Sequence, residues 1–311
     1  MKAIMLAAGK GTRCYPLTYL YPKLMLQVCG IPLLEYMISW FAGAPEIEKL
    51  YIVMNQSHAI EAVRHYVENR AGSLWRILSL FDQLGYKVEY TNPDLAIEIV
   101  SAGGRGTGGD LRSAMGSITQ HDTLDEDFVV CNADYVTLRQ LPDGALSPQL
   151  QLTDIMQYHG RCKQVLGTVM TVALVPVSRE DAWRFGVAHT YSLNGFHLVH
   201  GFAEKPEVEA LPQSPWINAG VYVIDRDFIL THSDKYLPDR PDTYLERTLL
   251  SELASEIKPS LAAYLLDLHR WFDIGTLKQL LEVNVCVAEE GRARLLNNPC
   301  NFSKEAEGSA L

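Results

Sequence analysis

Residues 5–18, "MLAAGKGTRCYPLT", follow a largely apolar run over residues 2–6 and contain two glycines, an arginine and a proline. The apolar run indicates a buried first strand close to the start of the chain. Gly9 and Gly11 then permit backbone angles that other residues resist. A glycine-rich turn behind a strand can direct its N–H groups at a phosphate, because no Cβ blocks the approach. The stretch therefore predicts an anion-binding loop.

Two better-known phosphate loops do not match this spacing. The mononucleotide pattern G-x-x-x-x-G-K-[ST] needs a glycine five positions before Gly9 and a Ser or Thr after Lys10, and neither is present. The dinucleotide pattern G-x-G-x-x-G meets Cys14 where its third glycine should stand. Two cations remain near the loop: Arg13, whose planar fork suits phosphate oxygens, and Lys23, a compact point charge. The alternative is an ordinary strand-to-helix loop with solvated cations.

Composition favours a globular cytoplasmic protein. The 311 residues are 48% hydrophobic and 21% charged, and the formal net charge of −10 argues against a nucleic-acid partner. The six cysteines are scattered without a C-x-x-C pair, which fits free thiols in a reducing compartment. No signal-peptide pattern opens the chain, and no apolar segment approaches the roughly 20 residues of a membrane span. We expect no membrane partner.

The first half alternates short β-rich runs with helical patterns. The runs "KAIML", "KLYIVM", "KVEYT" and "DFVVC" are separated by "PLLEYMISWFA" and "HAIEAVRHYVEN". Such alternation predicts an α/β fold with a doubly wound, mostly parallel, Rossmann-like sheet that binds its ligand at the carboxyl ends of the strands. An extra amphipathic helix is predicted near residues 73–85, with Leu74, Ile77, Leu78 and Phe81 on one face.

From about residue 165 the pattern becomes richer in strands, with turns such as Asn194-Gly195 between them, and predicts a mixed or antiparallel extension of the same sheet. Helices are expected from about Tyr244 to Glu256 and from about Thr276 to Glu289. We therefore predict one domain over residues 1–291, with lobes at about 1–160 and 161–291. Residues 292–311 are expected to form a frayed tail.

Two aspartates occupy positions suited to a metal. Asp134 follows the buried strand "DFVVC", and Asp273 precedes a turn and a helix start. Mg²⁺ takes one or two carboxylates together with substrate phosphates, so this pair facing a phosphate loop would form a magnesium site. A turn or helix-cap role is the alternative for each aspartate.

The glycine stretch and a series of later motifs together resemble the sugar-phosphate nucleotidyltransferases, also called nucleotide-sugar pyrophosphorylases. The stretch "LAAGKGTRCYPLTYLYPK" matches the signature of that family. The likeness continues in order through most of the chain, as "GTGGDL" (106–111), "VVCNAD" (129–134), "FGV" (185–187), "FAEKP" (202–206), "WINAGVYV" (216–223) and "WFDIGT" (271–276). The chain resembles the short form of the family, without a left-handed β-helix domain, so no acetyl-transfer activity is expected.

The resemblance implies a fold of the nucleotide-diphospho-sugar transferase type with an antiparallel sugar-binding extension, and a role for each matching residue. Arg13 and Lys23 would be catalytic, and Asp134 and Asp273 would hold Mg²⁺. The implied nucleotide-binding residues are Leu6, Ala7, Ala8, Gly9, Gly11, Thr12, Arg13 and Gly108. The implied residues for the sugar and its phosphate are Glu204, Lys205, Asn218 and Gly220.

The implied reaction is attack by a sugar 1-phosphate oxygen on the α-phosphorus of a nucleoside triphosphate, which releases pyrophosphate. The "GTGG" segment and the "PK" pair resemble the guanylyltransferases that act on mannose- or heptose-type sugar phosphates, so guanine is favoured. Uridylyl, thymidylyl and cytidylyl transfer stay open, as does transfer to a phosphorylated alcohol. A catalytically silent paralogue that binds a nucleotide sugar and a nucleotide-dependent oxidoreductase are rival readings. The resemblance also implies that the protein can form homo-oligomers.

Overall fold

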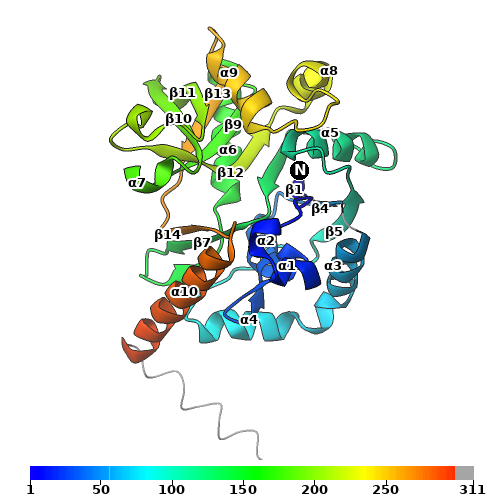
Figure 1. Ribbon diagram of the computed structural model, residues 1–311, viewed down its shortest axis with the longest axis vertical. Helices are drawn as coiled ribbons and strands as arrows, with labels where there is room; N and C mark the ends of the chain where they lie inside the picture. The colour runs from blue at the N-terminus through cyan, green and yellow to red at the C-terminus, as the bar shows by residue number, and fades with distance from the viewer. Residues whose placement is uncertain (56, 298–311) are drawn as a thin grey trace, which may run out of the picture.

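A nine-stranded sheet forms the centre of the molecule (Figure 1). The computed structural model describes residues 1–55 and 57–297. The strands lie in the order β10-β11-β13-β9-β12-β6-β1-β4-β5. Their bounds are β1 (Lys2–Leu6), β4 (Lys49–Met54), β5 (Ala96–Ser101), β6 (Phe128–Asn132), β9 (Met170–Pro176), β10 (Gly186–Leu193), β11 (Phe196–Glu204), β12 (Trp216–Ile224) and β13 (Leu261–Leu265).

The strands pair in parallel in one half of this sheet and mostly antiparallel in the other half. β1 pairs in parallel with β4 and β6, and β4 pairs in parallel with β5. In the second half, β12 is antiparallel to β6 and β9, and β11 is antiparallel to β10 and β13, whereas β13 and β9 are parallel. The predicted α/β class with an antiparallel extension is confirmed, and the two lobes share one continuous sheet.

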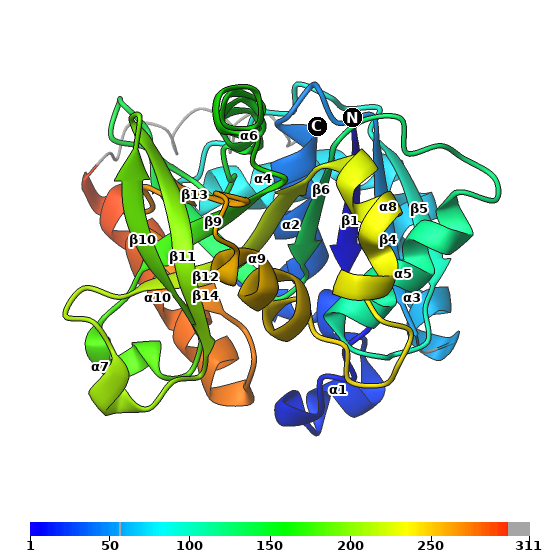
Figure 2. The same ribbon diagram turned by 90° about the horizontal axis from the view of Figure 1, so that it is seen from above.

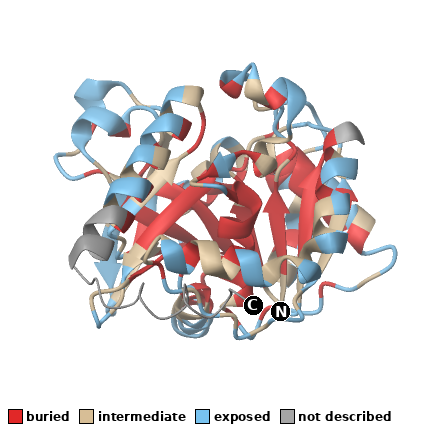
Figure 3. Cartoon of the chain, turned by 90° about the horizontal axis from the view of Figure 1, so that it is seen from below, coloured by how far each residue is buried: buried red, intermediate tan, exposed pale blue. Residues whose placement is uncertain are grey.

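Helices cover both faces of the sheet (Figure 2). Each face of the sheet has its own buried hydrophobic cluster. Successive side chains of β1 point to opposite faces, so Ala3 and Met5 belong to one cluster and Ile4 and Leu6 to the other. Figure 3 shows the buried strands between helices whose outer surfaces are exposed. The first face is covered by α2 (Leu33–Ala42), α3 (Ser57–Asn69) and α6 (Leu152–Leu166), and the second by α5 (Thr107–Ile118), α8 (Arg226–Tyr236), η5 (Glu246–Leu250) and α9 (Ser251–Ser255).

A three-stranded sheet joins the two lobes beside the main sheet. It consists of β14 (Arg270–Asp273), β7 (Tyr135–Gln140) and β8 (Leu146–Ser147), with α4 (Leu74–Gln83) and α10 (Leu277–Asn297) packed against it. The extra helix predicted from its apolar stripe is therefore present. Its side chains Ile77 and Phe81 are buried in this cluster. The remaining short elements are η1 (Thr12–Cys14), α1 (Leu17–Leu20), η2 (Lys23–Met25), β2 (Gln27–Val28), β3 (Ile31–Pro32), η3 (Arg70–Gly72), α7 (Arg179–Ala182) and η4 (Val208–Ala210).

The structure corrects two expectations about local structure. "KVEYT" (87–91) is not a strand, because its backbone is used elsewhere: the N–H of Lys87 donates to the carbonyl of Leu146 at 2.8 Å. The outer strand is β5, which begins further along the chain. Helix α10 continues past Glu289 to Asn297, so the prediction of a frayed tail is wrong for residues 292–297, which are helical. Residues 298–311 lie outside the described chain.

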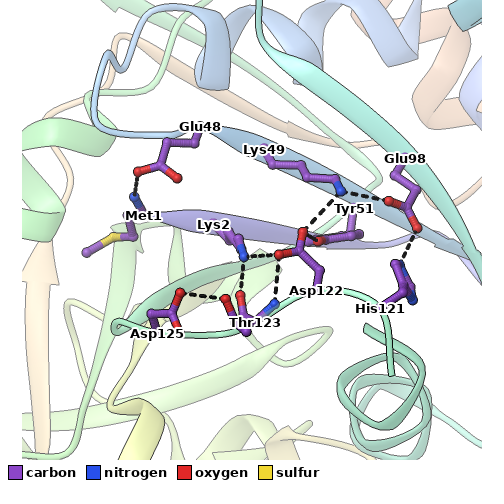
Figure 4. Close-up of polar contacts among 10 residues, drawn as sticks. All are labelled: Met1, Lys2, Glu48, Lys49, Tyr51, Glu98, His121, Asp122, Thr123 and Asp125. Atoms are coloured by element: carbon purple, nitrogen blue, oxygen red, sulfur yellow. Dashed lines mark hydrogen bonds and ion pairs between the residues drawn. The ribbon is translucent and has the colours of Figure 1, made fainter. Parts of the chain in front are cut away.

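A polar network ties together the amino ends of β1, β4 and β5 (Figure 4). Its centre is Asp122, whose carboxylate accepts hydrogen bonds from the ammonium groups of Lys2 and Lys49 and from the hydroxyl of Tyr51. Lys49 also contacts Glu98 at 2.8 Å. These bonds, with the Lys2 contact as the largest cause, hold the pKa of Asp122 well below its usual range. The network lies at the opposite end of the strands from the glycine loop.

The first prediction concerns this network. Asp122→Asn removes the charge that two lysines share, and we expect the free energy of unfolding to fall by about 1–2 kcal/mol at pH 7. A carboxylate with a lowered pKa stabilises the fold above its unfolded pKa of about 4, and this contribution is lost as the pH falls toward the folded pKa. The difference between wild type and variant should therefore be constant from pH 5 to 8 and shrink below about pH 4.

Denaturant unfolding at each pH measures this difference. The exposed Asp94→Asn is the matched control and should change little at any pH. If the difference in unfolding free energy between wild type and Asp122→Asn stayed constant down to pH 3, the stabilising role of the Asp122 charge would be contradicted.

Candidate active site

The glycine loop begins where β1 ends and is held against the neighbouring strand. The N–H of Ala7 donates to the carbonyl of Val53 at 2.8 Å. Gly11 has a φ of +63°, which favours glycine, and its carbonyl accepts a hydrogen bond from the Thr18 hydroxyl at 2.7 Å. The loop is thus fixed at both ends, with Gly9 exposed between them.

A pocket of about 170 Å³ opens beside this loop, at the carboxyl ends of β1, β4 and β6. Three predicted nucleotide-binding residues, Leu6, Ala7 and Gly9, line it, and Ala8 is buried next to them. Gly11 and Thr12 follow the pocket in the loop without lining it. The other lining residues are Lys10, Thr18, Pro22, Lys23, Leu24, Met54, Asn55, Ala59, Thr107, Asn132, Ala133 and Asp134.

Gly108 lies at the first turn of α5 but faces away from this pocket. Its N–H donates to the carbonyl of Thr243 at 2.8 Å, and the residue is buried. The preceding residue, Thr107, lines the pocket instead. The segment "GTGGDL" therefore contributes a threonine to the pocket and packs its glycines against the loop that contains Thr243.

The structure brings Asp134 and Asp273 together although they are far apart in the chain. Asp134 lies two residues after the end of β6 and directly precedes β7, whose Tyr135 lies opposite Asp273 in the register of β14. The N–H of Ile274 donates to the carbonyl of Asp134 at 2.8 Å. Burial, followed by the negative charge of Asp134, raises the pKa of Asp273 above its usual value. The two carboxylates therefore act on one another across one edge of the site.

Both carboxylates have the character expected of magnesium ligands. Asp134 Oδ1 is buried without a hydrogen-bond partner, and its Oδ2 contacts Lys23 Nζ at 2.9 Å. One oxygen of Asp273, Oδ2, accepts a hydrogen bond from Gln279 Nε2 at 3.0 Å. Within residues 1–55 and 57–297 no third His, Cys, Asp or Glu joins them. Two carboxylates with an unused oxygen fit Mg²⁺, which takes the rest of its ligands from phosphates and water.

Three cations border the same site. Lys23 pairs with Asp134, and Arg13 lines a second recess of about 620 Å³ together with Asp273 and Lys205. The positive charges of Lys23 and Arg13 both act to lower the pKa of Asp273. A protein with a formal net charge of −10 thus gathers positive charge at this site.

The predicted sugar-binding residues lie on β11 and β12. Asn218 is buried, donates from Nδ2 to the hydroxyl of Tyr222 at 2.7 Å and accepts at Oδ1 from the N–H of Gly220 at 2.9 Å. A bulge separates Asn218 from Tyr222, and Gly220 within it has a φ of +71°. Glu204 and Lys205 follow at the end of β11, with 3.6 Å between Glu204 Oε1 and Lys205 Nζ.

Cys14 is a buried core residue rather than a reactive thiol. Its side chain is fully buried in the cluster around the small sheet. Burial raises the pKa of the Cys14 thiol, so the nucleophilic thiolate is disfavoured. The structure therefore favours a small apolar filler over a reactive thiol at this position.

Several residues of the site were not predicted from the sequence. Gln279, on the first turn of α10, bonds Asp273, and Thr276 Oγ1 contacts Gln279 Oε1 at 2.8 Å. Thr107 and Asn132 line the pocket, and Glu246 lies behind them. Asn132 lies at the end of β6, two residues before Asp134, and this position at a strand end could have marked it.

Comparison with known proteins identifies the family of this chain. A family model described as "Nucleotidyl transferase" matches residues 2–290. The chain belongs to this nucleotidyl transferase family. Among its curated relatives, a UTP–glucose-1-phosphate uridylyltransferase from Synechocystis is 28% identical over 88% of this chain and 60% of that protein. A mannose-1-phosphate guanylyltransferase from Mycobacterium tuberculosis is also 28% identical, over 88% of this chain and 61% of that protein.

The family fold extends to solved structures. A UDP-glucose pyrophosphorylase in complex with UDP-glucose superposes with a TM-score of 0.67 at 20% identity, covering 93% of this chain and 98% of that chain. A UTP-bound UGPase from Acinetobacter baumannii gives a TM-score of 0.66 at 18% identity, over 96% and 99% of the two chains. These likenesses establish the fold.

The chain spans about three fifths of the length of the curated relatives described above. No described helix is both long and apolar enough to cross a bilayer.

The second prediction tests the β12 bulge. A Cβ on Gly220 would lie 2.9 Å from Tyr135 Cζ, and that ring is packed on Trp271 with 5.0 Å between ring centroids. We expect Gly220→Ala to lower the free energy of unfolding by about 2–4 kcal/mol. Gly195→Ala is the control, because Gly195 also has a positive φ but open space around it, and should cost about 1 kcal/mol. Denaturant unfolding compares them, and equal losses would show that the Tyr135 contact is unimportant.

Proposed function

We propose that this protein transfers a nucleoside monophosphate from a nucleoside triphosphate to a sugar 1-phosphate, giving a nucleotide sugar and pyrophosphate. The observation that carries the proposal is the convergence of Asp134 and Asp273 with Arg13, Lys23 and Lys205 beside the glycine loop. Membership of the nucleotidyl transferase family and relatives named for this chemistry support it.

The residues suit a reaction in which no side chain removes a proton. A phosphate monoester has a second pKa near 6 and is mostly dianionic at neutral pH, so its oxygen is already a nucleophile. Among the described residues that line the pocket and the recess there are cations and carboxylates but no Ser, Cys or His nucleophile. The barrier lies in bringing two polyanions into line, and positioning with charge neutralisation lowers it.

Each charged residue has a definite task in this proposal. Arg13, on the loop that follows the pocket, would bind triphosphate oxygens, and Lys23 would stabilise charge that develops in the transition state. Lys205 would hold the phosphate of the sugar. Asp134 and Asp273 would hold Mg²⁺, which, when bound, supplies positive charge to the phosphate oxygens. Gln279 fixes the orientation of the Asp273 carboxylate through its 3.0 Å hydrogen bond.

Guanine is the base that we propose, with a mannose- or heptose-type sugar. The "GTGG" segment supports this choice, as does the relative from Mycobacterium tuberculosis named as a mannose-1-phosphate guanylyltransferase. A uridylyl transfer is the second candidate, since the Synechocystis relative is named as a UTP–glucose-1-phosphate uridylyltransferase. Asn55, which lines the pocket at the end of β4, offers an amide that can contact either base.

Pyrophosphate release tests the function. The protein is incubated with Mg²⁺, each of the four common ribonucleoside triphosphates or dTTP, and a panel of hexose, amino-sugar and heptose 1-phosphates. We expect release only when one triphosphate and one sugar phosphate are present together, with GTP the preferred triphosphate. Binding of a nucleotide sugar without release from any pair would instead indicate a regulatory paralogue.

The third prediction concerns the charged residues. Arg13→Ala and Asp134→Asn should each lower kcat by about 10²–10³-fold, because the first removes a cation that would bind the phosphates and the second removes a carboxylate that would hold Mg²⁺. The thermal midpoint of both variants should stay within a few degrees of wild type. Arg64→Ala, on the exposed face of α3, is the matched control and should retain full activity. Near-normal turnover in a folded Arg13 or Asp134 variant would remove that residue from its assigned task.

A further inference from the structure

Glu246 lies between the two lobes, at the start of the π-helical turn η5. Its Oε2 accepts a hydrogen bond from the hydroxyl of Thr107 at 3.2 Å, and that hydroxyl in turn accepts from the N–H of Leu245 at 2.9 Å. Thr107 lines the pocket beside the glycine loop. Glu246 is therefore one side chain away from the nucleotide pocket, and it keeps partial access to solvent. π-Helical turns are rare and frequently mark functional sites.

A second chain of hydrogen bonds leads from Glu246 to the predicted sugar-binding asparagine. Asn218 Nδ2 donates to the hydroxyl of Tyr222 at 2.7 Å, and this hydroxyl donates to Glu246 Oε1 at 3.5 Å. Asn218 Oδ1 accepts from the N–H of Gly220. The direction of every bond is fixed, because a carboxylate only accepts. Glu246 thus orients Asn218 through Tyr222.

The charge of Glu246 is not neutralised by a nearby cation. In the part of the chain that the structure describes, no salt bridge reaches its carboxylate. Its neighbours are the neutral side chains of Thr107, Tyr222 and Asn132, and the carboxylate of Glu204 acts on it with the same sign. Burial and Glu204 together raise the pKa of Glu246. Glu246 accepts hydrogen bonds from Thr107 and Tyr222, and a carboxylate can accept about four, so acceptor positions remain for a ligand.

We propose that Glu246 is a specificity-determining residue that, with Glu204, accepts hydrogen bonds from ring hydroxyl groups of the sugar 1-phosphate. This inference rests on the proposed transferase function. A polyol presents several O–H donors in a fixed arrangement, which is what two neighbouring carboxylates require. Glu246 lies outside the charged cluster of Arg13, Lys23, Asp134 and Asp273, so it selects the sugar without contacting the transferring phosphates.

The test compares Glu246→Gln with wild type, using the preferred sugar 1-phosphate and its series of monodeoxy or deoxyfluoro analogues. We expect the KM for the parent sugar phosphate to rise roughly tenfold to a hundredfold, the range for a lost hydrogen bond to a charged acceptor. The KM for the triphosphate and the thermal midpoint should stay close to wild type. The analogue that lacks the recognised hydroxyl should lose little further affinity in the variant. Glu252→Gln, exposed on α9, is the matched control.

A purely structural role would give a different pattern. An equal rise in KM for both substrates, an equal loss for every deoxy analogue, or a loss confined to amino-sugar phosphates would overturn the proposal. If Glu246→Gln does not fold, Tyr222→Phe tests the same chain of bonds and should give the same selective rise. Calorimetric titration of the sugar 1-phosphate gives a second readout. Failure of wild type to release pyrophosphate would count against the proposed function, whereas normal release with an unselective variant counts against Glu246 alone.

Discussion

The antiparallel pairing of β14 with β7 is the constraint on which the candidate site depends. This pairing sets Asp273 opposite Tyr135 and lets the N–H of Ile274 donate to the carbonyl of Asp134. Two like charges are thereby held near one another, which is unfavourable until cations approach. Lys23 contacts Asp134 directly, and burial together with the charge of Asp134 raises the pKa of Asp273. The Mg²⁺ that we propose for this site would relieve the repulsion between the two carboxylates.

The three-stranded sheet also links the lobes, so the contacts that hold the lobes together also position the two aspartates. β7 continues from the strand that ends beside the glycine loop, and β14 leads into α10, which provides Gln279. Tyr135 packs on Trp271 and closely approaches Gly220, next to the predicted sugar-binding residues. This aromatic contact therefore lies between the strands next to the two aspartates and the β12 bulge. Rigid positioning of this kind is what a reaction between two polyanions requires.

Sequence reasoning reached the fold class because alternating apolar runs and helical stripes are local signals. It also placed Asp134 after a buried strand and Asp273 before a helix, and the structure brings this pair together. It missed β5 because that edge strand is only partly buried and carries few continuous apolar residues. "KVEYT" has strand-like composition, but its backbone forms hydrogen bonds outside the main sheet, as from the N–H of Lys87 to the carbonyl of Leu146. The tertiary contacts of Gln279 and Glu246 leave no pattern in their own neighbourhood, so those residues emerged only from the structure.

The most direct test follows the phosphate oxygens. A sugar 1-phosphate labelled with ¹⁸O at its three non-bridging oxygens is reacted with the preferred triphosphate, and the products are observed by ³¹P NMR. Direct attack on the α-phosphorus predicts that all of the label appears in the nucleotide sugar and none in pyrophosphate, with the two products formed in equal amounts. Label in pyrophosphate, or release of orthophosphate in its place, would contradict the account.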